Sequence, residues 1–150
     1  MKHIQLFKLF ESQDEVAKAA AAAGYAIGPV YHGTDDDFTV FDPKKVSVYF
    51  RDVPMKYHFA FKKDFAEGRG KTGKTKNVMS VYIKGNKPGT YDDDDNLIPS
   101  DADHVILGDL MITVRNPEQI KSADPVTYDD NGDPIPLNKR FDSNNKDIRY

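Results

Sequence analysis

Residues 27–32 read Ile-Gly-Pro-Val-Tyr-His and are followed by Gly33-Thr34. The β-branched and aromatic residues of this stretch predict a short strand that ends at the glycine. The alanine-rich sequence before it predicts a helix over 13–23, which begins with a Ser12–Glu15 capping box and stops at Gly24. A helix followed directly by a short strand indicates a mixed fold of helices and strands.

Further short elements follow along the chain. We predict strands at 46–50, 78–83, 105–107 and 110–114, and a second helix over 54–66 that opens at Pro54 and carries candidate buried aromatic residues at 57, 59, 61 and 65. Residues 85–101 are expected to form a loop, and the polar, proline-containing sequence near the end to form an irregular tail. Short strands with two helices near the start predict an α+β domain.

The chain length and composition limit the classes of protein to be considered. A chain of 150 residues makes one domain. We divide it into an N-terminal helical segment (1–24), a core (25–123) and a C-terminal tail (124–150) that packs on or extends from the core. No apolar run reaches 18 residues, so no transmembrane helix is expected. There is no cysteine, and the four histidines lack metal-ligand spacing, so neither a disulfide nor a metal site is expected, and a cytoplasmic location is the default.

The charge is unevenly distributed along the chain. Residues 51–90 carry 10 basic and 3 acidic side chains, whereas residues 91–150 carry 6 basic and 14 acidic ones. A basic middle segment between acidic flanks could hold an anion such as a nucleotide or a nucleic acid. The alternative is a lysine-rich helix and loop exposed to solvent.

The basic segment also contains a sequence with the pattern of a phosphate-binding P-loop. Residues 68–75 read Gly-Arg-Gly-Lys-Thr-Gly-Lys-Thr. A P-loop requires a strand before it and a helix after it, because the helix N-terminus faces the phosphates. The predicted order here is helix and then strand, which indicates a basic loop instead.

Several short motifs occur together in a fixed order. They are Val30–Thr34 with its His-Gly-Thr, Phe38, Phe41-Asp42-Pro43, Val48-Tyr49-Phe50, Phe59-Ala60, the stretch 114–123 and the ending 145–150. In this order they resemble the ADP-ribosyltransferase fold, in its His-Tyr-Glu branch, and in particular such domains of phage and prophage proteins. The resemblance covers about residues 25–150 and implies an α+β fold with a split β-sheet core, an N-terminal helix and an irregular tail.

The resemblance implies a site for NAD around the first strand and the residues after it. His32 would orient a ribose, and Gly33 would let its backbone approach the nicotinamide amide, since it has no side chain. Tyr49 and Phe59 would stack on the nicotinamide ring, with Tyr57 in reserve. The implied NAD-binding residues are Tyr31, His32, Gly33, Thr34, Tyr49, Phe50, Tyr57 and Phe59. Four of them have an ordinary structural alternative: Tyr49 and Phe59 as core residues, His32 as a hydrogen-bond partner of a neighbouring strand or turn, and Thr34 as a turn or cap residue.

The third catalytic position departs from the family pattern. Family enzymes with a glutamate carry it at the start of the strand that ends in the Gln119-Ile120 pair, and counting back places Met111 there. Asp109 is the nearest upstream acid, and we take it as the carboxylate that would stabilise an oxocarbenium-like cation. Glu118 and Gln119 are the alternatives at the far end of that strand. The expected catalytic set is therefore His32, Tyr49 and Asp109.

The implied activity is that of a mono-ADP-ribosyltransferase, a toxin-like glycosyltransferase of phage or prophage origin. It would bind NAD as a substrate without a metal, release nicotinamide and transfer ADP-ribose to a host macromolecule, a protein or alternatively a nucleic acid. It would act in the host cytoplasm, with delivery by the virion or membership of a larger phage polyprotein as further implications, and without a membrane partner. The alternatives are a catalytically degenerate binding module, suggested by Met111, and an NAD glycohydrolase.

Overall fold

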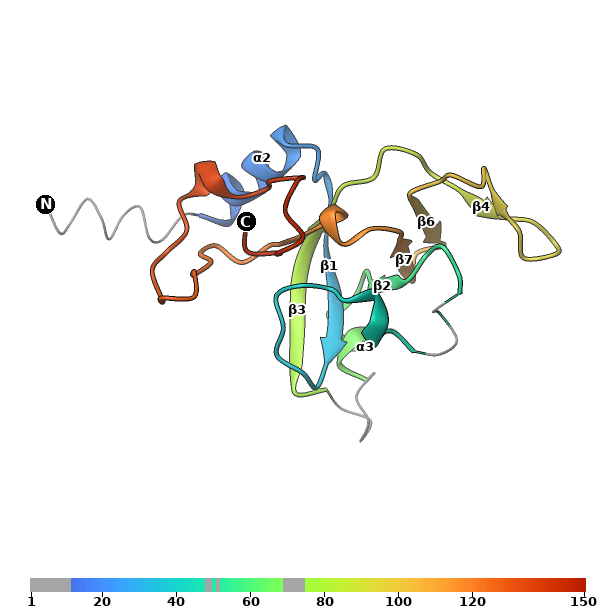
Figure 1. Cartoon of the computed structure of the whole chain (residues 1–150), viewed down its shortest axis with the longest axis horizontal. Coiled ribbons are helices and arrows are strands. Elements are labelled where there is room, and N and C mark those ends of the chain that lie inside the picture. Colours follow the sequence, from blue (N-terminus) through green and yellow to red (C-terminus); the bar gives the residue numbers. More distant parts are fainter. Residues whose placement is uncertain (1–11, 48–49, 51, 69–74) are drawn as a thin grey trace, which may run out of the picture.

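The structure is a computed structural model that describes residues 12–47, 50, 52–68 and 75–150 (Figure 1). Six strands form one sheet in the order β6-β7-β2-β1-β3-β8, in which every neighbouring pair is antiparallel. The strands are β1 (Ile27–Thr34), β2 (Tyr57–Ala60), β3 (Asn77–Ile83), β6 (His104–Leu107), β7 (Met111–Val114) and β8 (Ile120–Ser122). The helices α2 (Gln13–Ala22) and α3 (Lys63–Glu67) complete an α+β fold, as the sequence predicts at this level.

The helix α2 forms where local sequence signals place it. The Ser12 hydroxyl accepts a hydrogen bond from the Glu15 amide, which satisfies one of the free N–H groups of the first turn. Gly24 follows the helix with a φ of +95°, a value that glycine adopts at little cost. Val16 and Ala20 are fully buried and form a core cluster with Tyr25, Tyr82 and Phe141. No helix among the described residues is long and apolar enough to cross a membrane.

The predicted helix over 54–66 is wrong in its first half. Residues 57–60 form β2, and the helix α3 begins only at Lys63. Tyr57 and Phe59 are buried in the same core cluster, whereas His58 between them is not part of it. This period-two burial is that of a strand with one face on the core, and it outweighs the helix-opening preference of Pro54.

Three other boundaries differ from the predictions. Val46 and Ser47 lie outside any strand, and the Phe50 amide donates to the Ser47 carbonyl in a turn, so the described residues of 46–50 do not form the predicted strand. The expected loop 85–101 contains the hairpin of β4 (Thr90–Tyr91) and β5 (Leu97–Ile98). The strand expected to run on to the Gln119-Ile120 pair stops at Val114, and a 3-10 turn at Pro117–Gln119 separates it from β8.

The sheet consists of two halves that are joined by very little strand pairing. β1 pairs with β3 along its length, from Ile27–Ile83 to Thr34–Asn77, but it pairs with β2 only at Tyr31–Ala60. On the far side of β2, all four of its residues pair with β7. We call the line between β1 and β2 the seam. Beyond Tyr31, no residue of β1 pairs with β2, and the last part of β1 runs on the side of the start of β2 without a ladder between them.

The core on one face of the sheet bridges this seam. It combines side chains from both halves of the sheet with two residues from outside it, Phe41 and Ile148. The strand residues of this cluster are Val30, Tyr57, Phe59, Val81, Ile83, Ile112, Val114 and Ile120. Hydrophobic burial across the seam therefore holds together what strand pairing does not.

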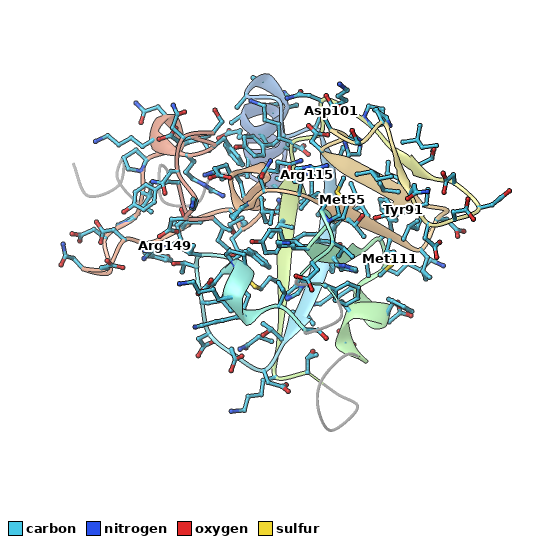
Figure 2. The ribbon with its side chains drawn as sticks, turned by 45° about the vertical axis from the view of Figure 1, so that its right-hand side comes forward. Met55, Tyr91, Asp101, Met111, Arg115 and Arg149 are labelled. Carbon is cyan, nitrogen blue, oxygen red and sulfur yellow. The ribbon has the colours of Figure 1, made fainter. Side chains whose placement is uncertain are left out.

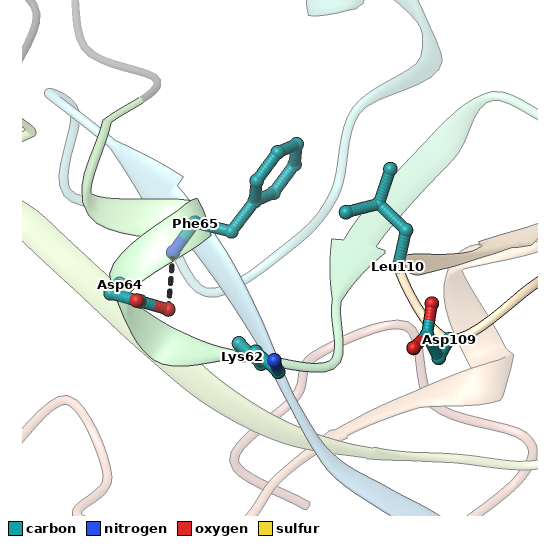
Figure 3. A pocket seen from close by; sticks show the side chains of 5 residues that line it. All are labelled: Lys62, Asp64, Phe65, Asp109 and Leu110. Atoms are coloured by element: carbon teal, nitrogen blue, oxygen red, sulfur yellow. Dashed lines mark hydrogen bonds between the residues drawn. The ribbon is translucent and has the colours of Figure 1, made fainter.

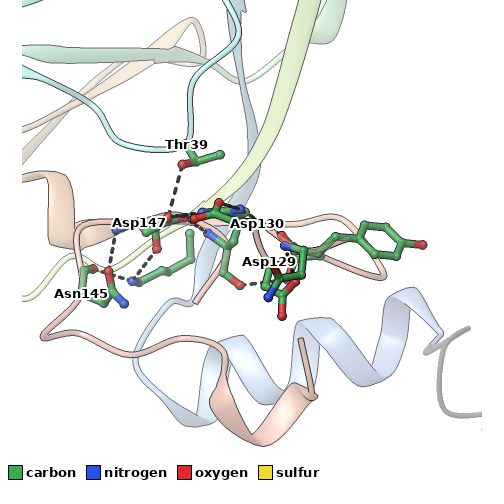
Figure 4. Close-up of polar contacts among 10 residues, drawn as sticks. Thr39, Asp129, Asp130, Asn145 and Asp147 are labelled. Carbon is green, nitrogen blue, oxygen red and sulfur yellow. Dashed lines mark hydrogen bonds and ion pairs between the residues drawn. The ribbon is translucent and has the colours of Figure 1, made fainter. Parts of the chain in front are cut away.

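The C-terminal segment is tied to this core by an internal polar network (Figure 4). The buried Lys121 ammonium donates to the Asn145 carbonyl at 2.6 Å and to the Asp147 carbonyl at 3.2 Å. The Asp147 carboxylate pairs with Arg149 at 2.7 Å and accepts from the Thr39 hydroxyl at 3.2 Å. Burial alone would raise the pKa of Asp147, but the hydrogen bonds and charge of Arg149 lower it. The irregular tail is thus bonded both to β8 and to the segment that follows β1.

Candidate functional site

A small cavity lies at the seam, where β1 and β2 separate, and we call it the seam cavity. Its volume is about 110 Å³, and it is lined by β1, β2, α3 and the first residue of β7. Five residues that the sequence singles out contribute to its wall: Tyr31, His32, Gly33, Phe59 and Met111. The fold therefore brings together the end of the first strand, one predicted stacking residue and the third-position residue, although they are up to 80 positions apart in the chain.

His32 is held in one orientation at the edge of this cavity. Its Nδ1 lies 3.0 Å from the His58 carbonyl oxygen, and its ring is surrounded by Phe38, Phe41 and Phe59 at centroid distances of 6.2, 5.2 and 5.6 Å. Burial lowers the pKa of His32, against the smaller opposite effect of the His58 carbonyl, so the ring is neutral at pH 7. A carbonyl can only accept, so Nδ1 carries the proton and Nε2 is a hydrogen-bond acceptor. In this tautomer, His32 can accept a hydrogen bond through Nε2 but cannot donate one from that atom.

Gly33 is required by the close approach of α3. A Cβ atom at this position would lie 2.0 Å from the Ala66 carbonyl oxygen and 2.8 Å from the Thr75 methyl group. No side chain can occupy that space without a shift of the helix. The space that a side chain at Gly33 would occupy is thus filled by the backbone of α3.

The aromatic residues named from the sequence lie in different places. Phe59 lines the seam cavity and contacts the His32 ring, but it is also 1% exposed and part of the core. Tyr57 faces that core beside Phe41, at a centroid distance of 5.6 Å, and does not line the cavity. Burial raises the pKa of Tyr57 to about 12. Phe50 lies over the His58 ring, at a centroid distance of 4.2 Å, in a separate hollow. Tyr49 lies outside the described residues.

Two ring-bearing residues of the cavity wall were not assigned to it from the sequence. His58 contributes from β2, and Phe65 contributes from α3. The sequence predicts Phe65 only as a buried aromatic residue, and it predicts a helix, with no site residue, at His58. The alternation Tyr57-His58-Phe59 was the signal that could have identified His58, since a strand places its middle residue on the face opposite the two aromatic ones.

The carboxylate expected near the cavity lies next to it, in an adjoining cavity (Figure 3). Asp109 sits in the turn between β6 and β7 and lines a space of about 260 Å³ together with Lys62, Asp64, Phe65 and Leu110. Phe65 borders both cavities. Met111 contributes to the wall of the seam cavity. None of the described residues that line this cavity is acidic.

The other two third-position alternatives are placed elsewhere. The Gln119 side chain is buried and used in the fold: its amide nitrogen donates to the Lys84 and Asp103 carbonyls, and its oxygen accepts from the Asn116 amide. Glu118 borders a separate open hollow beside Lys84. Both residues follow the break after Val114, so neither lies on the strand of Met111 as the sequence had suggested.

The remaining predicted features have structural roles or lie outside the described part. Thr34 accepts a hydrogen bond from the Asp36 amide through its hydroxyl, as a turn residue does. The described flanks of the P-loop-like sequence are α3 before it and β3 after it, in the order that a phosphate-binding loop excludes. Residues 69–74 of that sequence are not described. Within the described residues, no group of three or more histidine or acidic side chains is placed to hold a metal ion.

Comparison with known proteins gives no relationship that would assign a function. No protein-family model matches the chain, and neither a curated protein nor a solved structure matches it.

Proposed function

We propose that the protein binds NAD with the nicotinamide ring in the seam cavity and transfers the ADP-ribose unit to a host macromolecule. One observation carries the proposal: His32, Gly33, Phe59 and Met111, which the resemblance to ADP-ribosyltransferases assigns to one site, all lie at one cavity on the seam. The separation of the sheet beyond Tyr31 is compatible with the split sheet that the same resemblance implies.

The size and walls of the cavity suit a single planar ring. Its volume of about 110 Å³ is of the order needed for one six-membered ring, because an apolar protein cavity of roughly 150 Å³ holds benzene. His58, Phe59 and Phe65 contribute to its wall, and a bound ring that stacks on one aromatic side chain gains about 1 kcal/mol. In the adjoining cavity, Lys62 would attract the negatively charged diphosphate of NAD. Asp64 and Asp109, which line the same cavity, would repel it.

The proposed transfer breaks the bond between the nicotinamide nitrogen and the ribose carbon. Nicotinamide leaves as a neutral molecule with the bonding electron pair, and a nucleophile of the acceptor forms the new bond to that carbon and loses a proton. His32 would fix a ribose hydroxyl through Nε2. Asp109 would reach the positive charge that develops on the sugar only from the adjoining cavity, past Phe65.

A second function, binding of NAD without transfer, is favoured by Met111. A thioether at this wall cannot stabilise a cation as a carboxylate does, so a degenerate binding module would keep the ring contacts and lose the chemistry. Hydrolysis of NAD without an acceptor is a third outcome that the same assay distinguishes.

The test combines calorimetry with a labelling assay. We expect NAD to bind, and Phe65→Ala to weaken this binding by about fivefold, since one ring contact is lost. Tyr128→Ala, at an aromatic residue that is 53% exposed and does not line the seam cavity, is the matched control and should bind NAD as the unchanged protein does.

Incubation with NAD labelled in its adenylate phosphate and a bacterial lysate then separates the three functions. Label on protein or nucleic acid indicates transfer, free ADP-ribose indicates hydrolysis, and binding without either indicates a binding module. Absence of NAD binding in calorimetry would overturn the proposal.

A further inference from the structure

A second and larger hollow lies on the other side of His58. Its volume is about 680 Å³, and it is bordered by β2, β6, β7, Phe50, residues 53–55 and the β4–β5 hairpin. We call it the hairpin pocket. Met55 and Tyr91, which line it, lie on the side of the molecule that carries this hairpin (Figure 2). His58 lines both this pocket and the seam cavity, so the two spaces share one wall.

The walls of the hairpin pocket are apolar and open to solvent. Four of its large apolar side chains remain between 36% and 39% exposed: Phe50, Val53, Tyr91 and Leu107. Large apolar side chains that are scattered over a surface need no explanation, but a contiguous group that lines a hollow is typical of a binding surface. The pocket is therefore suited to a bulky apolar group.

One acidic residue lines the pocket, next to an acidic hairpin tip. Asp95 lines it and belongs to the run Asp92–Asp95 at the tip of the hairpin. The Asp92 carboxylate fixes this tip by accepting from the Asp94 and Asn96 amides, both at 2.8–2.9 Å. Among the described lining residues there is no lysine or arginine. The charge of the described lining residues therefore favours a cation over a phosphate.

The pocket borders the outer edge of the sheet. β6 is the last strand in the sheet order, and its Leu107 side chain lines the pocket. On the outer side of β6, Pro88 forms an isolated bridge to His104, and the His104 carbonyl accepts from the Gly89 amide; no described strand pairs with the rest of that side. An extended peptide can add to such an edge with its main chain and place alternate side chains in an adjacent pocket.

From these three features, we infer that the hairpin pocket binds an extended polypeptide segment in which a bulky apolar side chain is flanked by basic residues. The apolar side chain enters the pocket, the basic neighbours lie against the acidic hairpin tip, and the main chain follows the edge of β6. Such a segment would end beside His58, next to the seam cavity. In the transfer reaction, this segment would carry the group that accepts ADP-ribose. That role rests on the proposed function, whereas the binding of the segment does not.

The experiment measures fluorescence anisotropy of a labelled ten-residue peptide that has a central leucine-phenylalanine pair between lysines and arginines. We expect it to bind in the absence of NAD. Two peptides of the same length serve as references, one with glutamates in place of the basic residues and one with serines in place of the apolar pair. The serine peptide should bind at least about tenfold more weakly, because it has no large apolar side chain to bury. The glutamate peptide should also bind at least about tenfold more weakly, because its charges repel those of the acidic hairpin tip.

Two pairs of variants locate the binding. Leu107→Asn should weaken peptide binding by about tenfold. Its control is Ile106→Asn, at the preceding position of the same strand, which should leave the binding unchanged because Ile106 is 49% exposed and does not line the pocket. Asp95→Asn should weaken it and reduce its dependence on salt, and asparagine tolerates the φ of +61° at this position. Asp93→Asn, which removes the same charge from the same loop outside the pocket lining, is its control.

Some results would overturn the inference. They are equal binding of the acidic peptide, equal losses in the variants and their controls, or no binding of the basic apolar peptide. Concentration-dependent self-association in sedimentation, abolished by Leu107→Asn, would assign the pocket to a second copy of the chain instead. Peptide binding in a protein that fails to bind NAD would retain the pocket and remove the proposed function, so the two failures are distinguishable.

Discussion

Gly33 lies beneath the backbone of α3, and its missing side chain is a condition of the fold. Gly33→Ala places a methyl group 2.0 Å from the Ala66 carbonyl oxygen, so helix and strand must move apart. We expect a loss of about 1–3 kcal/mol in the free energy of unfolding, as for other overpacked sites. Urea denaturation measures it. Gly68→Ala is the control, because a Cβ there meets nothing closer than 3.8 Å; an equal loss in both variants would contradict this explanation.

His32 is expected to titrate below the ordinary histidine pKa of about 6.5, because its burial disfavours the charged ring. The unfolded chain then binds a proton that the folded protein does not, between pH 6.5 and the lower folded pKa. Stability should therefore fall as the pH decreases through this window.

NMR of the histidine ring signals gives this pKa directly and identifies the tautomer with the proton on Nδ1. A measured pKa at or above 6.5 would show that the ring is not desolvated as the structure indicates.

Lys121 lies in β8 and bonds this strand to the C-terminal segment, so its protonation affects the stability of the fold. Burial lowers the pKa of Lys121 to about 8, although Asp142, Asp147 and Glu118 partly oppose this by their charges. Between pH 8 and 10.5 the unfolded chain retains a proton that the folded protein has released. The free energy of unfolding should therefore increase with pH in this range, by about 3 kcal/mol from this group.

Urea denaturation at pH 7.5, 9 and 10.5 checks this expectation. Lys121→Met should remove the increase, whereas Lys139→Met, at an exposed lysine, should leave it in place. The same slope in both variants would attribute the effect to other groups.

The contrast between α2 and β2 shows which elements the sequence determines. The limits of α2 follow from neighbouring residues, because Ser12 caps it and Gly24 ends it, and these signals are readable without a structure. β2 is a strand because Tyr57 and Phe59 meet a core built by distant residues such as Phe41 and Ile112, and Pro54 gave the opposite local signal. Tertiary burial decides such a short segment.

The candidate site also has one part that the local sequence predicts and another part that depends on the tertiary fold. The motif around His32 and Gly33 marks the end of β1 in the sequence, and this end does border a cavity. The partners that complete the cavity, Phe65 and His58, depend on how α3 and β2 return to β1, which no local pattern encodes. Asp109 lies in the adjoining cavity because the β6–β7 turn positions it two residues before Met111.

The whole molecule should unfold as one unit in spite of its seam. A single core cluster contains Val81 from one half of the sheet and Ile112 from the other, so neither half can lose its packing alone. Ile112→Ala should reduce the free energy of unfolding by about 2–5 kcal/mol, and Val81→Ala should shift the midpoint of the same transition. Circular dichroism and tyrosine fluorescence should give coincident curves; two separate transitions would mean that the halves unfold independently.

Ile148 closes a core whose other members lie between residues 30 and 120, and this order matters while the polypeptide is being made. The strands emerge from the ribosome before Ile148, so the nascent chain leaves part of the apolar face of its sheet uncovered until residue 148 has left the exit tunnel. During that interval the Lys121 ammonium also remains hydrated, because the carbonyl groups of Asn145 and Asp147 that receive it have not yet been synthesised. Completion of this core therefore comes after all of the strands have been made, and until then part of their apolar surface is open to non-native contacts.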